Sequence, residues 1–433
     1  MTGICMLVGE FWPSPSANGV IAGNIANELA KDSSVTVLTR RTRRSMPHHE
    51  IHNGVSVVRI DDWHLILHNS LMTRRGSAAK WSIPLWSALI FVLRGSNWLS
   101  RAFRRDSVNW GFVKRLEKAL MEIDEQKPID VLIPVSAPHE ETFAGVSFKE
   151  SHPETVLIVY QLDRFANAES LYELRLLRSG KEMRNMHLER RVLDVSNALF
   201  ILPPLEDHYA RPELSHLVHK ITRTEHPLVQ DLRSRGSSPL SEPGKPVLLY
   251  AGSLDLKLRN PSFLISVLAD ERLRSLGISV HMYAYGSGAE LVRQAASGGS
   301  HWLSSHGRVG IEEVHLAMAR ADVLLTIGNN SDSEVPSKLF EYLSFGKPIL
   351  HFYFSERDAY LGYLEKYPQA LTLKIGGDSE REDAVIRITR FLLDGTHGDV
   401  SMDYVQQTFR ECTPAFVARQ FRDAINADAT GTS

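Results

Sequence analysis

Short apolar runs alternate with stretches of helical spacing along the first half of the chain. The run "ICMLVGEF" near the start has the unbroken apolar character of a strand that is buried on both faces. The loop "WPSPSANG" follows it, and Val20, Ile21, Ile25 and Leu29 then fall on one side of a helix. The segment "SVTVLTR" alternates as the next strand, and "DVLIPVSAP", "TVLIVYQLD" and "NALFILPP" continue the series. This pattern predicts a β-loop-α-β unit extended by further strands.

A second series of the same kind begins after residue 246. The segments "VLLYAGSL", "SVHMYAYG" and "DVLLTIG" have the pattern of strands, and "PSFLISVLADERLRSLG" and "IEEVHLAMARA" between them have that of helices. Strands that alternate with helices of ten or more residues are typical of parallel, doubly wound sheets. The fold class is therefore α/β with two such sheets.

The domain boundaries follow from changes in this pattern. The first domain covers residues 1–226 and carries a helical, Trp/Arg/Leu-rich insertion at about 62–125. Residues 227–246 are rich in proline and lack periodicity, which indicates a linker. The second domain covers 247–400, and the tail 401–433 reads as terminal helices without a strand.

Composition narrows the class of protein. Of the 433 residues, 43% are hydrophobic and 23% charged, which is typical of a globular protein. The net charge of −2 argues against a nucleic-acid partner that is bound through a chain-wide basic field. Cys5 and Cys412 are the two cysteines, and the start of the chain has no basic segment ahead of a long apolar core. These features predict a cytoplasmic protein.

One stretch raises the question of a membrane. No uninterrupted apolar run reaches the roughly 18 residues that a membrane span needs. Residues 81–105, "WSIPLWSALIFVLRGSNWLSRAFRR", mix tryptophans, aliphatic residues and a basic end. Such a composition suits an interfacial helix at the inner face of a membrane, with its arginines toward anionic lipid. The alternative is an ordinary buried helix with a basic, exposed end.

The segment "EVPSKLFEYLSFGKPIL" at residues 334–350 has the signals of a short, firmly bounded helix. Pro336 fits the first turn, where its missing N–H is no loss, and Gly346 supplies the stop. An apolar stripe is expected to face the sheet, made of Leu339, Phe340 and Leu343. The strand "PILHFYF" resumes after it.

The start of this helix is also a candidate anion site. Its first backbone N–H groups, those of Ser337, Lys338 and Leu339, have no partner within the helix. Glu341 lies about 7.5 Å along the axis from Pro336, where its carboxylate could accept the hydroxyls of a ribose attached to a bound phosphate. The alternative is structural, with Lys338 and Glu341 forming an i,i+3 pair and Glu334 favouring the helix N-terminus.

The same segment resembles the Glu-x7-Glu signature of retaining GT-B glycosyltransferases of the family-4 type. The resemblance implies two Rossmann-like domains that face a cleft. It also implies that Glu334 contacts the donor sugar and is catalytic, that the amides of Ser337–Leu339 hold the diphosphate of the donor, and that Glu341 binds its ribose.

Other segments of the second domain extend this resemblance to the donor site. "YAGSLDLKLRNPSFL" is similar to the family's diphosphate-binding segment. Ser253 stands where the family commonly has an arginine, Arg259 matches the second basic position, and Lys257 is an alternative for it. Val309, in "SHGRVGIEE", corresponds to a residue whose backbone contacts the nucleotide base.

The first domain supplies the remaining candidates. Gly19 matches a glycine of the family's first loop, and Asn18 takes the place of a second one. His139 lies a few residues beyond the position of the family's usual histidine, where Val135 and Ser136 stand, and is a candidate catalytic residue. Asp163 matches an acidic position that faces the cleft. Loop packing, solvation and capping are the structural alternatives for these residues.

The resemblance implies a transferase that moves a sugar from a nucleoside-diphosphate sugar to an acceptor hydroxyl with retention, in polysaccharide or glycolipid biosynthesis. The sequence holds no cysteine pair, HExxH or Asp-x-Asp, so neither a metal nor a cofactor is expected. The expected partners are the donor, a saccharide or lipid-linked acceptor, and a membrane surface through residues 81–105. Two alternatives stay open: a sugar-nucleotide epimerase or hydrolase of the same architecture, and an inactive scaffold that keeps the fold.

Overall fold

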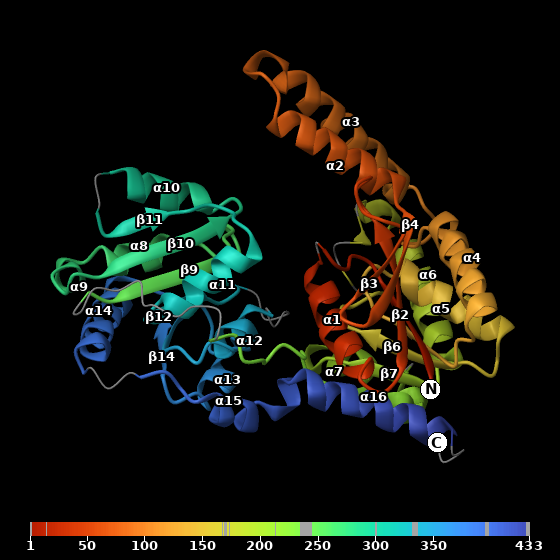
Figure 1. Ribbon diagram of the computed structural model, residues 1–433. Helices are drawn as coiled ribbons and strands as arrows, with labels where there is room; N and C mark the ends of the chain where they lie inside the picture. Colours follow the sequence, from red (N-terminus) through yellow and green to blue (C-terminus); the bar gives the residue numbers. More distant parts are fainter. Residues whose placement is uncertain are drawn as a thin grey trace. The chain divides into compact units, whose positions relative to one another are not determined.

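The computed structural model divides the chain into two compact units, Met1–Pro227 with Pro414–Ser433 and Leu228–Thr413 (Figure 1). The structure describes residues 2–13, 15–166, 168, 171–172, 174–212, 214–233, 245–298, 301–330, 337–394 and 398–429. Most of the expected linker, residues 234–244, lies outside these ranges. The described part of the tail expected at 401–433 is mostly helical, and its last helix belongs to the first unit.

The first unit is built on an eight-stranded sheet with the order β3-β4-β2-β1-β5-β6-β7-β8. Its neighbouring strands are parallel except for the antiparallel pair β3–β4. The strands are β1 (Gly3–Val8), β2 (Ser34–Arg41), β3 (His49–His52), β4 (Val55–Asp61), β5 (Val131–Pro134), β6 (Val156–Gln161), β7 (Ala198–Ile201) and β8 (Ile221–Arg223). Every residue of β1 is buried, as expected for a strand in the middle of a parallel sheet.

Helices cover this sheet. They are α1 (Ala17–Leu29), α4 (Trp110–Gln126), α5 (Glu140–Ser151), α6 (Arg178–Val195), α7 (Glu206–Tyr209) and α16 (Pro414–Ala429). Short 3₁₀ turns lie at Arg175–Leu177, Pro203–Leu205 and Ser215–Lys220. Phe421 of α16 stacks on Phe200 of β7, with ring centroids 4.3 Å apart, so the C-terminal helix completes the core of the N-terminal sheet.

Two further helices of the first unit, α2 (Trp63–Gly76) and α3 (Ile83–Ala102), form an antiparallel hairpin that extends away from the sheet (Figure 1). The 3₁₀ turn Lys80–Ser82 joins them. Trp81 is 84% exposed and Phe91 77% exposed, so the interpretation of residues 81–105 as an ordinary buried helix is wrong. Among the described residues, no helix is both long and apolar enough to span a membrane.

A buried ion cluster ties the base of this hairpin to the sheet. Arg40, near the end of β2, lies within 3.2 Å of three carboxylates. These belong to Asp62, which caps α2, and to Glu140 and Glu141 at the start of α5. Glu141 is fully buried, so its charge depends on the guanidinium beside it.

The second unit contains a six-stranded parallel sheet with the order β11-β10-β9-β12-β13-β14. Its strands are β9 (Val247–Ser253), β10 (Ser279–Tyr285), β11 (Leu303–Ser305), β12 (Val323–Ile327), β13 (Ile349–Tyr353) and β14 (Ala370–Lys374). Its helices are α8 (Ser262–Leu268), α9 (Glu271–Arg274), α10 (Ala289–Ser297), α11 (Ile311–Arg320), α12 (Lys338–Leu343), α13 (Leu361–Leu364), α14 (Asp378–Leu393) and α15 (Met402–Thr408), followed by the 3₁₀ turn Arg410–Cys412.

Both sheets are doubly wound, which confirms the predicted fold class. In each, the first strand of the unit lies inside the sheet and the chain winds outward from it in both directions. The direction changes between β1 and β5 in the first sheet and between β9 and β12 in the second. Ligands of open α/β sheets bind beyond the carboxyl ends of the strands at such a switch point. The loops that follow these four strands are therefore where a site is expected.

Candidate functional site

Arg259 spans the switch point of the second sheet. Its Nε donates to Oδ1 of Asn329 at 2.6 Å, and its Nη1 donates to Oγ of Ser253 at 3.0 Å. Ser253 ends β9, and Asn329 follows β12 in the sequence "IGNN". These bonds hold the guanidinium in one position between the two neighbouring strand ends.

The contact between Ser253 and Arg259 explains how the chain can lack an arginine at position 253. The resemblance puts an arginine at position 253, and the chain has a serine there. In the structure the guanidinium of Arg259, six residues further on, contacts the Ser253 hydroxyl. A positive charge is thereby present beside the end of β9 without an arginine at that position. The side chain of Lys257 is exposed in the intervening loop.

The helix α12 is fixed to the same strand by Tyr342. Its hydroxyl donates to the carbonyl oxygen of Ala251 at 3.1 Å and accepts from the Ala251 amide at 2.9 Å. Leu339, Phe340 and Leu343 are fully buried, which confirms the predicted apolar stripe.

The stop at Gly346 is confirmed as well. Its φ of 66° is in the left-handed region, and an added Cβ would lie 2.6 Å from the carbonyl oxygen of Val400. Both features exclude a side chain here, so α12 ends where the sequence predicts.

The start of α12 is described from Ser337 onward, and Glu334 and Pro336 lie outside the described residues. The amide of Leu339, expected to be open to an anion, donates to the hydroxyl of Tyr360 at 3.2 Å. Burial raises the pKa of Tyr360 and the nearby Arg259 opposes that rise, so Arg259 and the start of α12 share one neighbourhood. No pattern in the sequence indicated Tyr360.

Both carboxylate oxygens of Glu341 have partners. His315 of α11 lies 2.8 Å from Oε1 through its Nε2, and Nζ of Lys338 lies 2.5 Å from Oε2. Burial would raise the pKa of Glu341, but these two neighbours outweigh it and hold that pKa below its ordinary value. The i,i+3 pair that the sequence left as an alternative is therefore present. An ionised carboxylate has about four lone-pair sites, so it can still accept from a ligand.

A second polar pair lies behind this segment. The side chains of His351 in β13 and of Asp358 are buried, and Nε2 of His351 lies 3.3 Å from Oδ2 of Asp358 without hydrogen-bond alignment. Oδ1 of Asp358 accepts from the Tyr360 amide at 2.8 Å. The carboxylate also lies over Gly328, where an added Cβ would come within 1.7 Å of it. This pair thus fixes the loop that carries Tyr360.

Val309 lies in the loop before α11. It is partly buried and packs against the core cluster beneath α12, while the guanidinium of Arg308 lies 5.0 Å above the Tyr285 ring. The side chain of Val309 has a packing role, and its backbone remains the candidate contact for a nucleotide base.

The first sheet brings its own candidates together at the β1/β5 switch point. Nδ2 of Asn18 donates to the carbonyl oxygens of Ser136 and Ala137, at 3.1 and 3.3 Å, and to Oδ2 of Asp163 at 3.0 Å. Asn18, which replaces a glycine of the resembled motif, therefore links the loops that follow β1, β5 and β6. Asp163 is exposed and available to a ligand.

Gly19 and His139 flank this cluster. An added Cβ at Gly19 would lie 1.9 Å from the carbonyl oxygen of Glu10, so the glycine allows the loop to pack against α1. His139 is 9% exposed, and its ring lies 4.5 Å from that of Phe165. Burial lowers the pKa of His139, with Glu140 and Asp163 opposing the shift, so the imidazole is neutral at pH 7.

Within the described ranges, no group of three or more His, Cys, Asp or Glu side chains is arranged to hold a metal ion. The polar groups at both switch points are amides, hydroxyls, single carboxylates and one guanidinium. Such a set suits an anionic ligand with hydroxyl groups.

Comparison with known proteins identifies the fold. No family model matches the chain, and no curated protein matches it. Among solved structures, sucrose-phosphate synthase from Thermosynechococcus elongatus matches with a TM-score of 0.62 and 12% identity, over 100% of both chains. An alpha,alpha-trehalose-phosphate synthase (UDP-forming) from Burkholderia vietnamiensis matches with 0.59 and 10%, over 99% of both. Anabaena HepE in complex with UDP and glucose matches with 0.57 and 10%, over 99% of this chain and 100% of HepE.

The chain therefore has the GT-B fold, which confirms that part of the resemblance. In the second unit, Arg259, Ser337, Lys338, Leu339 and Glu341 gather at the carboxyl edge of the sheet. The first unit brings Asp163 next to Asn18 in the same way.

Proposed function

We propose that the protein transfers a sugar from a nucleoside-diphosphate sugar to an acceptor hydroxyl, with the donor bound by the second unit. The observation that carries this proposal is the fixed position of Arg259 between the ends of β9 and β12, near α12, which carries the second glutamate of the Glu-x7-Glu motif. Solved structures of the same fold include HepE in complex with UDP and glucose and a UDP-forming synthase, so UDP is the first nucleotide to test.

Arg259 would stabilise the leaving group. The departing nucleoside diphosphate gains negative charge as the glycosidic bond to the sugar breaks. Among the described residues, Asn329 and Ser253 accept from Nε and Nη1 of the guanidinium, and the Tyr250 hydroxyl lies beside it as well. A guanidinium has five N–H donors, so donors remain for phosphate oxygens. Because those two bonds already fix the group, little reorganisation is needed when the charge develops. In this proposal the leaving group is stabilised without a metal or a cofactor.

The Glu-x7-Glu motif would bind the rest of the donor. Glu341 is held ionised by His315 and Lys338, and an ionised carboxylate is a strong acceptor for the ribose hydroxyls. In this proposal the amides at Ser337 and Lys338 face the diphosphate, and Glu334 contacts the donor sugar. Val309 contributes its backbone to the base.

The first unit would receive the acceptor. Asp163 is exposed at the β1/β5 switch point, and its Oδ2 is oriented by Asn18. His139 is neutral, so one of its ring nitrogens can accept a proton from an acceptor hydroxyl while the other donates a hydrogen bond. Retention of the anomeric configuration follows from the resemblance to the retaining enzymes, which makes Glu334 and His139 the catalytic candidates.

The wider role is proposed from the same resemblance and from the hairpin α2–α3. The acceptor is a saccharide or a lipid-linked saccharide, in polysaccharide or glycolipid biosynthesis at the cytoplasmic face of a membrane. An inactive scaffold is the less favoured alternative. Its best support was Ser253, and the contact between Arg259 and Ser253 supplies the charge that position 253 lacks.

The test is a transfer assay. The purified protein is incubated with UDP-sugars and a set of saccharide and lipid-linked acceptors, and NMR follows the anomeric protons of donor and product. The proposal predicts a product with the same anomeric configuration as the donor. An inverted product would refute retention alone, and donor consumed equally with and without an acceptor would favour the epimerase or hydrolase.

A further inference from the structure

The hairpin α2–α3 leaves an unusual amount of apolar surface uncovered. In its two helices, only Ile66, Leu71, Ile90 and Ala102 are buried. The exposed large apolar side chains from Trp63 to Phe103 are Trp63, Leu67, Met72, Trp81, Leu85, Leu89, Phe91, Val92, Trp98, Leu99 and Phe103. Scattered single residues of this kind are normal on a protein surface, but a contiguous set marks an interaction site.

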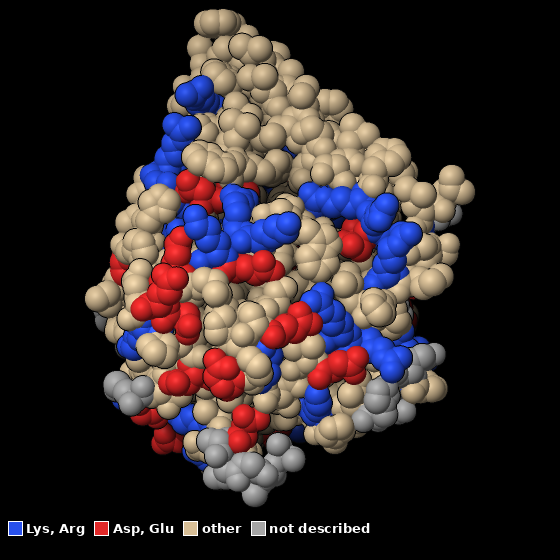
Figure 2. All heavy atoms as spheres, turned by 90° about the vertical axis from the view of Figure 1, so that its right-hand side faces the viewer, with Lys and Arg blue, Asp and Glu red and all other residues tan. Residues whose placement is uncertain are grey.

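The charge of this hairpin differs from that of the rest of the chain. Residues 63–105 contain seven Lys and Arg residues and no Asp or Glu, while the whole chain has a net charge of −2. The seven are Arg74, Arg75, Lys80, Arg94, Arg101, Arg104 and Arg105. On the face drawn in Figure 2, tan and blue atoms cover the uppermost part, which belongs to the hairpin, and red atoms begin below it.

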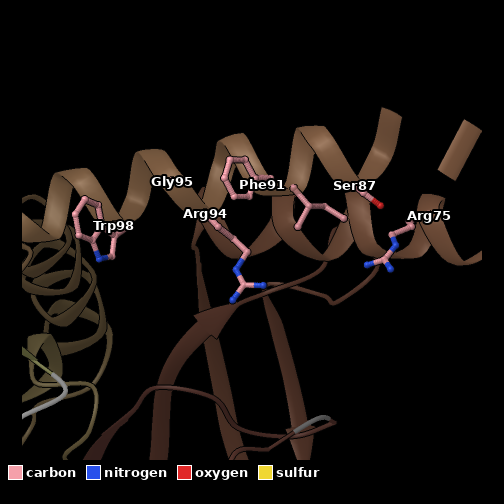
Figure 3. A pocket seen from close by; sticks show the side chains of 7 residues that line it. Arg75, Ser87, Phe91, Arg94, Gly95 and Trp98 are labelled. Atoms are coloured by element: carbon pink, nitrogen blue, oxygen red, sulfur yellow. The ribbon is translucent and has the colours of Figure 1, made fainter. Parts of the chain in front are cut away.

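Apolar and basic side chains meet in a groove of about 550 Å³ on the hairpin. One side of α3 lines it at helical spacing, and Arg75 of α2 completes it (Figure 3). The residues of α3 are Ser87, Ile90, Phe91, Arg94, Gly95 and Trp98. Arg75 and Arg94 are both exposed, and neither forms an ion pair within the described part of the chain. Two unpaired guanidinium groups thus border a largely apolar groove.

We propose that the hairpin α2–α3 docks on a bilayer of anionic phospholipid, with Arg75 and Arg94 binding headgroup phosphates and the aromatic residues around them entering the interface. Guanidinium groups bind phosphate oxygens in pairs of parallel hydrogen bonds. Tryptophan and phenylalanine are favoured at the depth where headgroups meet acyl chains. With its 20 residues, α3 is about 30 Å long, enough to lie along the surface.

Charge complementarity favours this occupant over two others. A second copy of the hairpin would bring like charges together, which disfavours pairing. A nucleic acid would satisfy the arginines but leave the aliphatic residues on both helices in water. An anionic bilayer satisfies both kinds of side chain. The inference depends on the proposed function only where it links the hairpin to a lipid-linked acceptor. Binding to vesicles is measured without any donor or acceptor, so its outcome is separate from that of the transfer assay.

The experiment is flotation of the full chain with vesicles of phosphatidylcholine, with and without phosphatidylglycerol. The wild-type protein is expected to float with the anionic vesicles and to be released by salt, because salt screens exposed charges. Each basic side chain near an anionic surface strengthens binding roughly fivefold, so Arg75→Glu/Arg94→Glu should weaken it at least about 30-fold. Trp81→Ser/Phe91→Ser should also weaken it, at unchanged net charge.

The matched control is Lys118→Glu/Arg190→Glu, which makes the same change of net charge at exposed positions of α4 and α6 in the same unit. It should bind the anionic vesicles like the wild type. The proposal is overturned if the wild type does not float, if the control loses as much binding as the hairpin variant, or if the hairpin variant floats normally. Two further results would overturn the proposal if they occurred without vesicle binding. One is binding of the protein to duplex DNA. The other is a dimer, seen by sedimentation, that is absent in the Trp81→Ser/Phe91→Ser variant.

Discussion

Replacing Glu341 distinguishes between its two possible roles. In the first it binds the ribose of the donor, and in the second it only pairs with His315 and Lys338. In Glu341→Ala, the pair with Lys338 is lost, and Lys338 is 34% exposed, so water replaces the carboxylate there. Such a pair contributes about 0.5 kcal/mol, and the contact with the more buried His315 adds about 1 kcal/mol. Alanine favours the helix by a few tenths of a kcal/mol in return. We therefore expect stability to fall by about 1 kcal/mol.

Binding of a nucleotide should change far more. A hydrogen bond to a charged group contributes about 1.5–3 kcal/mol, so loss of the carboxylate predicts a Kd for UDP that is roughly 10- to 150-fold higher. Calorimetric titration measures the Kd, and urea denaturation followed by circular dichroism measures the stability.

The control for this experiment is Glu382→Ala on α14, because Glu382 also pairs with a basic side chain, Arg272, at 2.6 Å in the same unit. That variant should keep the wild-type Kd. If Glu341→Ala lowers stability and leaves the Kd for UDP unchanged, Glu341 is only a structural partner of His315 and Lys338, and the ribose assignment is wrong.

Three further predictions follow from single residues. Gly346→Ala should destabilise the second unit by more than about 1 kcal/mol. A side chain in the left-handed region costs about that much, and its Cβ would also approach the Val400 carbonyl. An unchanged midpoint of urea unfolding would contradict this. Arg40→Ala should destabilise the first unit by about 3–5 kcal/mol because three carboxylates lose their shared partner, and Arg41→Ala, whose ion pair with Asp61 lies nearer solvent, should cost less. The pKa of His139, measured by NMR titration, should lie below the ordinary value of 6.5. As the pH falls, the unfolded chain then binds a proton at His139 before the folded protein does, so this residue should lower stability below that value. A midpoint above 6.5 would refute the assignment.

The sequence predicted the features that depend on local pattern. Strand runs, the two doubly wound sheets, the apolar stripe of Leu339, Phe340 and Leu343, and the stop at Gly346 all follow from periodicity and backbone preference. These properties are set by residues that are close in sequence, so one chain is enough to see them.

The contacts that build the site depend on distant residues instead. Arg259 meets Asn329 across 70 positions, and Leu339 meets Tyr360 across 21. Asn329 follows a strand in the sequence "GNN", and such residues are common where a strand ends, so the sequence alone did not single it out. His315 lies on an ordinary amphipathic helix and gave no signal.

For the hairpin α2–α3, the sequence showed the composition but not which side chains are exposed. The composition of residues 81–105 was visible in the sequence, but an amphipathic helix has the same composition whether its apolar side meets a core or water. The structure decides this through the exposure of Trp81 and Phe91. Asn18 is similar, since the sequence showed that it replaced a glycine, but only the structure shows its bonds to the loops that follow β5 and β6.

The most direct test of the central claim, that the donor binds at the switch point between β9 and β12, is calorimetric titration of the wild type, Arg259→Ala and Arg387→Ala with UDP, GDP and ADP. Arg387 is a partly exposed arginine of α14 in the same unit, and its pair with Asp383 lies on the helix surface. The account predicts saturable binding of one nucleotide, weakened about 10- to 150-fold by Arg259→Ala and unchanged by Arg387→Ala. Equal affinity of Arg259→Ala and the wild type, or no binding of any of the three nucleotides to the wild type, would contradict it.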